Sequence, residues 1–129
     1  MATDRSALSR RERQIMDAIY LLGEATAQDV LEQIADPPGY SAVRALLRIL
    51  ETKGHVRHRQ DGPRYVYHPT VPRERARDSA LRQLVRTFFD GSAGAAAAAL
   101  LDLSRDDLTD DELAQLEALV ERAQGGTLT

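Results

Sequence analysis

The chain of 129 residues has room for one domain or two very small ones, which excludes folds that need roughly 200 residues or more, such as the large barrel enzymes. Apolar residues make up 43% and charged residues 29%, but aromatic residues make up only 5%, so aliphatic side chains must build the core. The chain has no Cys, which excludes disulfides, thiolate nucleophiles and Cys-ligated metals. A polar N-terminus and no apolar run of ~20 residues predict a cytoplasmic protein without membrane insertion.

The net charge of −3 conceals an uneven distribution along the chain. Residues 1–39 carry a net charge of −3, residues 40–77 carry +6 and residues 78–129 carry −6. A basic block between two acidic segments is typical of a nucleic-acid-binding surface. The alternative at this point is a solvated basic face without a ligand.

Capping residues and apolar spacing predict two helices in the first third of the chain. Ser9 followed by Glu12 forms a capping box, and the helical spacing continues to the first glycine of the chain. Thr26 followed by Asp29 is a weaker start signal for a short second helix, which residues 36–39 (DPPG) should end. The apolar stripes of these two helices are Ile15, Met16, Ile19 and Leu22, and then Val30, Leu31 and Ile34.

A third helix and a hairpin follow this break. The apolar stripe of the helix is Val43, Leu46, Leu47 and Leu50, and Lys53 with Gly54 supplies a basic last turn and a C-cap. Residues 55–68 alternate β-branched or aromatic with basic residues around a turn at 61–63, which predicts a two-stranded hairpin. We expect four of its side chains to face the helices: Val56, His58, Tyr65 and Tyr67. We expect three others to face solvent: Arg57, Arg59 and Arg64.

The second half predicts three more helices. Pro72 suits the first turn of a long helix that ends before Asp90. Ser92 is placed to cap an Ala-rich helix that runs to about Leu101. Residues 109–112 form a capping box for a last helix, which two glycines end after Gln124.

Three helices followed by a basic hairpin are the elements of a winged helix, in which the third helix enters the DNA major groove and the hairpin contacts the backbone beside it. The outward side of the third helix is neutral to positive and comprises Ser41, Arg44, Ala45, Arg48 and Thr52. Arg44 and Arg48 are candidates for base contacts because arginine can donate two hydrogen bonds to guanine. Ser41 is a candidate for a phosphate contact. The remaining candidates for phosphate contacts are Arg57, Arg59 and Arg64 in the hairpin and, more weakly, Lys53.

Nothing in the sequence favours catalysis. His55 and His58 lie three residues apart on a predicted strand, so they face opposite sides and cannot share a metal ion. The carboxylates of residues 106–112 crowd the start of a helix, where the helix dipole favours negative charge. We therefore predict no enzyme, no cofactor and no metal, with a metal-dependent hydrolase as a distant alternative.

We expect a winged-helix domain over residues 1–71, a helical dimerisation region over 72–124 and a disordered tail over 125–129. The helical region has few large side chains and cannot readily form its own core. A second copy of the chain would bury Leu81, Leu84, Val85, Phe88, Phe89, Leu113, Leu116, Leu119 and Val120. The alternative is that these helices fold back onto their own N-terminal domain.

Four segments, taken in order, resemble the penicillinase-repressor family of bacterial transcription factors, the BlaI, MecI and CopY group. They are residues 12–19 (ERQIMDAI), 40–56 (YSAVRALLRILETKGHV), 64–69 (RYVYHP) and 88–91 (FFDG), and the similarity extends from about Leu8 to Val120. The resemblance implies a mainly α-helical, homodimeric winged-helix repressor that binds operator dyads, blocks transcription of nearby genes and is released by a signal. It also implies that DNA is read mainly through the third helix.

The chain departs from the family pattern at positions that bear on which DNA sequence it binds and which signal releases it. Ala42 and Ala45 stand where relatives often carry Thr, and Ile49 stands where Arg is common, which implies a different operator. In β-lactam-responsive members a membrane sensor leads to cleavage of an Asn-Phe bond. The aligned bond here is Ala99–Leu100, which lacks that signature but marks where a sensor protease system would act. The absence of Cys excludes the copper-sensing route.

Two functions of different classes stay open from the residues themselves. The first is a dimeric repressor that binds an operator. The second is a protein-interaction adaptor whose winged helix does not bind DNA. A salt-dependent DNA affinity distinguishes them, because phosphate contacts release counterions.

Overall fold

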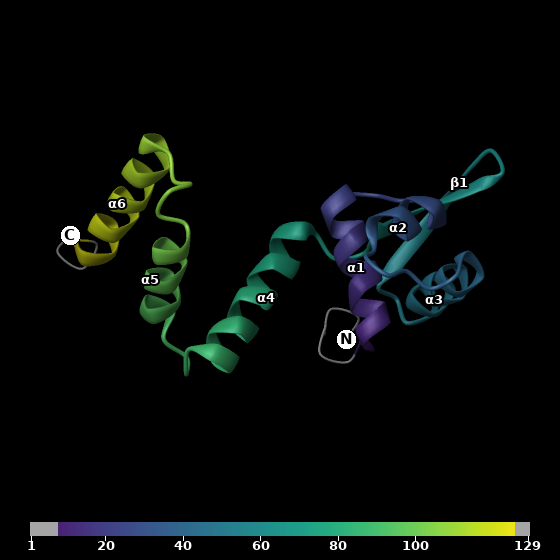
Figure 1. Ribbon diagram of the computed structural model, residues 1–129, viewed down its shortest axis with the longest axis horizontal. Helices are drawn as coiled ribbons and strands as arrows, with labels where there is room; N and C mark the ends of the chain where they lie inside the picture. Colours follow the sequence, from purple (N-terminus) through teal and green to yellow (C-terminus); the bar gives the residue numbers. More distant parts are fainter. Residues whose placement is uncertain (1–7, 126–129) are drawn as a thin grey trace. The chain divides into compact units, whose positions relative to one another are not determined.

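The computed structural model describes residues 8–125 of the chain (Figure 1). In chain order its elements are α1 (Arg10–Leu22), α2 (Ala27–Gln33), α3 (Tyr40–Thr52), β1 (Val56–Asp61), β2 (Arg64–Pro69), α4 (Arg73–Phe88), α5 (Ala93–Leu103) and α6 (Asp110–Gly125). The chain divides into two compact units after Leu81. The prediction of a mainly helical protein with one small hairpin is confirmed.

Capping boxes begin the first two helices, as predicted. The Ser9 N–H donates to Glu12 Oε1 at 2.8 Å, and the Glu12 N–H donates to Ser9 Oγ at 3.1 Å. Thr26 and Asp29 exchange the same two bonds at 3.0 and 3.1 Å, so the second box is complete. The sequence predicts that residues 36–39 end the second helix, but α2 already ends at Gln33. The next residue, Ile34, is extended and buried ahead of the two prolines.

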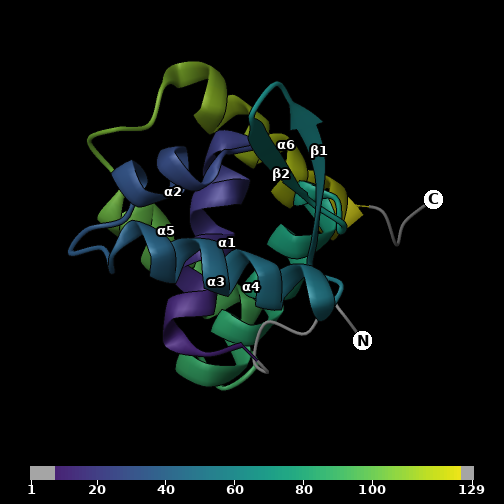
Figure 2. The ribbon, with the colours of Figure 1, turned by 90° about the vertical axis from the view of Figure 1, so that its right-hand side faces the viewer.

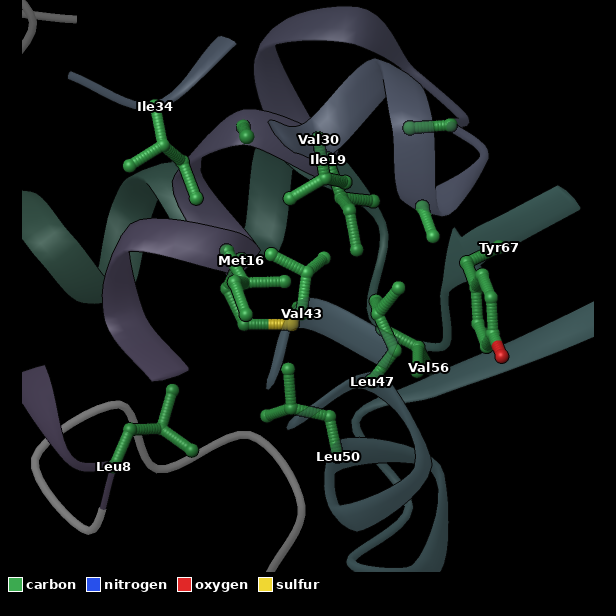
Figure 3. Close-up of a cluster of buried hydrophobic side chains, with 14 residues drawn as sticks. Leu8, Met16, Ile19, Val30, Ile34, Val43, Leu47, Leu50, Val56 and Tyr67 are labelled. Atoms are coloured by element: carbon green, nitrogen blue, oxygen red, sulfur yellow. The ribbon is translucent and has the colours of Figure 1, made fainter. Parts of the chain in front are cut away.

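Aliphatic side chains from α1, α2, α3 and the start of β1 converge on one core, which Figure 3 shows in close-up. Its fully buried large members are Ile15, Ile19, Val30, Val43, Leu47, Leu50 and Val56. Each such side chain contributes about 1.5–3 kcal/mol by leaving water. Leu22, predicted to share the stripe of α1, is 43% exposed, because the last turn of α1 extends past this cluster.

The hairpin is an antiparallel pair in which Val56 pairs with Pro69 and Asp61 with Arg64. Gly62 begins the tight turn with a positive φ of 62°, a conformation that glycine adopts without strain. Ala25 exchanges two backbone hydrogen bonds with Tyr67, at 2.9 and 2.8 Å. The base of the hairpin is therefore fastened to the segment between α1 and α2.

The expected burial of one hairpin face was only half right. The register puts Val56, His58, Tyr65 and Tyr67 on one face, as expected, but only Val56 and Tyr67 are buried. His58 and Tyr65 are exposed because the hairpin projects beyond the helices, as Figure 1 shows, so that the helices cover only its base. Val66 on the opposite face is also buried, at 7% exposure.

The beginning of α4 is tied to the end of α1. The Tyr20 hydroxyl donates to the Val71 carbonyl at 2.9 Å, and the Arg73 guanidinium donates to the carbonyls of Tyr20 and Leu21. A cation at carbonyls that end a helix is favourable, because these groups carry partial negative charge. These bonds explain why the first turns of α4 belong to the N-terminal unit.

The last two helices begin at the caps that the sequence predicts. Ser92 Oγ accepts from the Ala95 N–H at 3.1 Å, and α5 then runs two residues beyond the predicted end. The Glu112 N–H donates to Thr109 Oγ1 at 3.1 Å, while Glu112 Oε1 accepts from the Thr109 N–H at 3.0 Å. The predicted tail lies outside the described residues from residue 126 onward, and Gly125 is the last residue of α6.

Within residues 8–125 no single helix is long and apolar enough to cross a membrane, although α4 and α5 taken together across the bend between them have the length and composition.

Candidate nucleic-acid interface

The outer face of α3 is exposed and positively charged. Of the inward residues of α3, Val43, Leu47 and Leu50 are buried in the core and Leu46 is half-buried against it. Its outward residues Ser41, Arg44, Ala45 and Arg48 are exposed. The Arg44 guanidinium lies 5.9 Å from the centre of the Tyr40 ring, a distance that permits a cation–π contact. Arg44 and Arg48 have no carboxylate partner in the described part of the chain. The predicted stripe therefore presents two uncompensated guanidinium groups.

The hairpin places its arginines in different surroundings. Arg57 is exposed and has no ion-pair partner within residues 8–125, and Arg64 lies 3.5 Å from the carboxylate of Asp61 near the tip. Arg59 donates two hydrogen bonds to Glu24, at 2.6 and 3.0 Å. These bonds lower the pKa of Glu24 and raise that of Arg59. Arg59 is therefore the hairpin arginine whose charge is most compensated.

Lys53, at the end of α3, is partly exposed and pairs with a buried carboxylate. Its ammonium donates to both carboxylate oxygens of Glu12, at 2.9 and 3.1 Å, and Glu12 is only 4% exposed. The hydrogen bond from Lys53, together with the Ser9 N–H, lowers the pKa of Glu12. The sequence indicates only a helix cap for Glu12 and a DNA contact for Lys53, and no local pattern connects the two residues.

An aromatic and charged junction joins the hairpin to α3. His58 Nδ1 lies 2.7 and 2.8 Å from the carboxylate oxygens of Glu51. The His58 ring stacks on Tyr65, with 4.2 Å between the ring centres, and lies 5.5 Å from the Tyr67 ring. This junction links the hairpin to the last turn of α3, and both elements face the viewer in Figure 2.

A groove of about 310 Å³ lies between the start of α2, the start of α3 and the hairpin. Its lining includes three tyrosines and two arginines and contains no carboxylate: Tyr40, Tyr65, Tyr67, Arg44 and Arg64. Burial raises the pKa of the Tyr67 hydroxyl. The sequence patterns did not single out Tyr40 and placed Tyr65 against the helices. The sequence does show an aromatic residue, Tyr40, directly after the break at residues 36–39, and this position could have marked it as a candidate.

His55, His58 and the acidic residues near 106–112 lie at separate places in the fold. His55 is buried just before β1, and His58 binds Glu51. The acidic residues near 106–112 lie at the start of α6, where Glu112 completes the cap. In the part of the chain that the structure describes, no three His, Cys, Asp or Glu residues are grouped closely enough to hold a metal ion.

The residues predicted for a dimer interface are mostly exposed within the single chain. Phe88 is 75% exposed, and no described residue of α4, α5 or α6 is buried. The exposed members of the predicted set are Leu81, Leu84, Phe88, Leu113, Leu119 and Val120. A largely apolar groove of about 370 Å³ runs between α5 and α6. The Ala99–Leu100 bond lies within the regular helix α5.

The three helices, the hairpin fastened by Ala25 and the exposed basic face of α3 define a winged helix-turn-helix unit. Over residues 8–122 the sequence matches the family described as penicillinase repressor. The chain belongs to this family, which confirms the resemblance drawn from four segments of the sequence. It is accordingly a transcriptional regulator from a family of DNA-binding proteins.

Two further similarities cover most of the chain. An uncharacterized 16.5 kDa protein encoded in the ptsI 3′ region of Latilactobacillus sakei is 25% identical over 122 residues, which are 93% of this chain and 82% of the relative. The solved structure of Bordetella bronchiseptica BpsR, whose DNA binding is regulated by 6-hydroxynicotinic acid, shares 19% identity with a TM-score of 0.49. That match covers 81% of this chain and 78% of BpsR.

Proposed function

We propose that the protein is a cytoplasmic, homodimeric repressor that binds a DNA dyad through α3. The observation that carries the proposal is the exposed pair Arg44 and Arg48, one helical turn apart and without carboxylate partners in the described chain. Both guanidinium groups are available to donate to guanine in the major groove. Ser41, exposed in the first turn of α3, is placed to contact a phosphate.

The hairpin supplies contacts to the DNA backbone. Arg57, which has no ion-pair partner within residues 8–125, and Arg64, which has only a 3.5 Å contact with Asp61, are the principal phosphate-binding residues. Arg59 and Lys53 contribute less, because Glu24 and Glu12 compensate their charges. This ranking separates Arg59 from Arg57 and Arg64, which the sequence places in one group, and keeps Lys53 as the weaker candidate that the sequence indicates.

A second copy of the chain covers the apolar residues of the helical region, residues 72–124, while residues 1–71 bind DNA. The exposure of Leu81, Phe88 and Val120 supports this division, because covering large apolar side chains with a partner removes them from water. A twofold axis then presents two copies of α3 to two half-sites. The alternative, folding back onto the N-terminal domain, would leave the protein monomeric.

If a sensor protease releases this repressor, it acts at Ala99–Leu100. Both residues lie within α5, which must unfold locally before a protease can bind the bond in an extended form. A bond at the end of a helix would need less local unfolding before a protease could bind it. Release by a ligand would instead leave the chain intact, so the length of the protein after induction separates the two routes.

Capture of source-genome fragments on the purified protein, followed by salt titration of the best fragment, tests the proposal. We expect a short dyad beside a few genes, with an affinity that falls steeply as salt rises. No retention above background at about 50 mM salt would refute the repressor. That result would favour the protein-interaction adaptor.

A further inference from the structure

The groove between α3 and the hairpin combines groups that suit a phosphodiester. Tyr40 and Tyr65 line it and are each 45% exposed. Neither hydroxyl has a protein partner within residues 8–125. Arg44 and Arg64 lie in the same lining, and no carboxylate does. The groove is thus electropositive and carries two unused neutral donors.

Each tyrosine is held in place by a neighbouring side chain. Tyr65 stacks on His58, whose ring is in turn bound to Glu51 of α3. Tyr40 is the first residue of α3 and lies beneath the Arg44 guanidinium. The two tyrosines therefore line the groove from two different elements, Tyr40 from α3 and Tyr65 from the hairpin.

We propose that Tyr40 and Tyr65 form a saddle that holds the DNA sugar–phosphate backbone where it passes between α3 and the hairpin. The inference rests on the proposed function and names a contact that basic residues alone do not provide. The hydroxyls donate to phosphate oxygens, and each ring packs against the deoxyribose with the face that does not contact His58 or Arg44. Arg44 and Arg64 supply the positive charge on either side of the groove.

This contact recognises the backbone and carries no base information. Loss of either hydroxyl should therefore weaken binding to all duplex sequences equally. Tyrosine is neutral when it donates and displaces no counterion, so its loss should leave the salt dependence of binding unchanged. Loss of an arginine contact should reduce that dependence, which makes the two kinds of contact separable by experiment.

The test uses the full chain carrying Tyr40→Phe, Tyr65→Phe or both, with the captured genomic duplex and a mixed-sequence duplex of equal length as probes. We expect each substitution to lower affinity for both probes by about 3- to 10-fold, the effect of one hydrogen bond. The slope of log affinity against log salt should stay at the wild-type value. Arg64→Ala, the comparison variant, should reduce the magnitude of that slope by about 0.9.

Tyr20→Phe is the matched control, because it removes a hydroxyl that donates to Val71 outside the groove. Duplexes with one phosphate replaced by a methylphosphonate add a second readout. Replacement of the contacted phosphate should weaken binding of the unaltered chain, whereas the Phe variants, which already lack the contact, should lose no further affinity. If Tyr40→Phe and Tyr65→Phe both bind DNA with the affinity of the unaltered chain, the saddle is overturned while the proposed function stands. Lack of DNA binding by the unaltered chain would overturn both.

Discussion

Lys53 Nζ lies 2.9 Å from Glu12 Oε2, and this ion pair joins the end of α3 to the start of α1. Glu12 is 4% exposed and also accepts the Ser9 N–H, so one buried carboxylate serves both a helix cap and a contact between helices. Lys53 keeps 44% of its side-chain surface exposed. The pair therefore helps to set the position of α3, the helix that we propose reads DNA.

Replacement of Lys53 by Met should destabilise the N-terminal unit by about 1–3 kcal/mol, because it leaves the buried Glu12 carboxylate without its charged partner. Urea unfolding followed by circular dichroism measures the change. Lys53→Arg is the control and should retain most of the stability, since it keeps a cation at this position. Unchanged stability of Lys53→Met, together with a weaker salt dependence of DNA binding, would instead assign Lys53 to a phosphate.

The same pair makes stability depend on acid. Hydrogen bonds from Lys53 and Ser9 hold the pKa of Glu12 below 4.5, its ordinary value. A depressed folded-state pKa contributes stability that is complete above about pH 4.5 and is lost as pH falls through the folded-state value. Thermal melts between pH 7 and pH 3 should show this loss, and Glu12→Gln should show a smaller one. Equal acid sensitivity of the two proteins would contradict the assignment.

Glu24 should restrain DNA binding by compensating Arg59. Replacement of Glu24 by Gln removes a carboxylate that accepts two bonds from the guanidinium, which frees the cation for a phosphate. We expect higher affinity for all duplexes and a salt slope steeper by about 0.9 in fluorescence-anisotropy titrations. Glu117→Gln makes the same change in net charge on exposed α6 and should have little effect. Similar gains in both variants would show that only net charge matters.

Arg44 and Arg64 should differ in what they recognise. Arg44→Ala should cost about 1–3 kcal/mol of binding free energy and relax base preference at one operator position. Arg64→Ala should weaken binding to all sequences alike. Affinity selection from a randomised duplex pool compares the base preference of each variant with that of the unaltered protein. Uniform loss in both variants would remove Arg44 from base reading.

A charge in the aromatic part of α4 should separate the subunits. Phe88 is 75% exposed in the single chain, and Phe88→Asp would place a carboxylate in the proposed interface. We expect monomers by light scattering, with weak operator binding. Thr87→Asp adds the same charge at the adjacent exposed position, off the apolar stripe, and should remain dimeric. An unchanged mass for Phe88→Asp would place this residue outside the interface.

The hairpin separates what local sequence predicts from what packing decides. Alternation correctly predicted that His58 and Tyr65 share a face with Val56 and Tyr67, because side-chain direction in a strand is a local property. It did not predict that the first two are exposed, since that depends on how far the helices extend along the strands. The end of α2 also differs from the prediction, because local patterning does not show that Ile34 leaves the helix and is buried in an extended conformation.

The sequence by itself determined the order of the elements, the capping boxes, the apolar stripe of α3 and its outward arginines, because each depends on residues within one or two turns of each other. Only the tertiary structure decided which basic groups are compensated. Lys53 meets Glu12 across 41 residues, and Arg59 meets Glu24 across 35. It also brought Tyr40 and Tyr65 into one groove. Such contacts arise from the packing of α1 and α3 and the fastening of the hairpin at Ala25, which local periodicity does not specify.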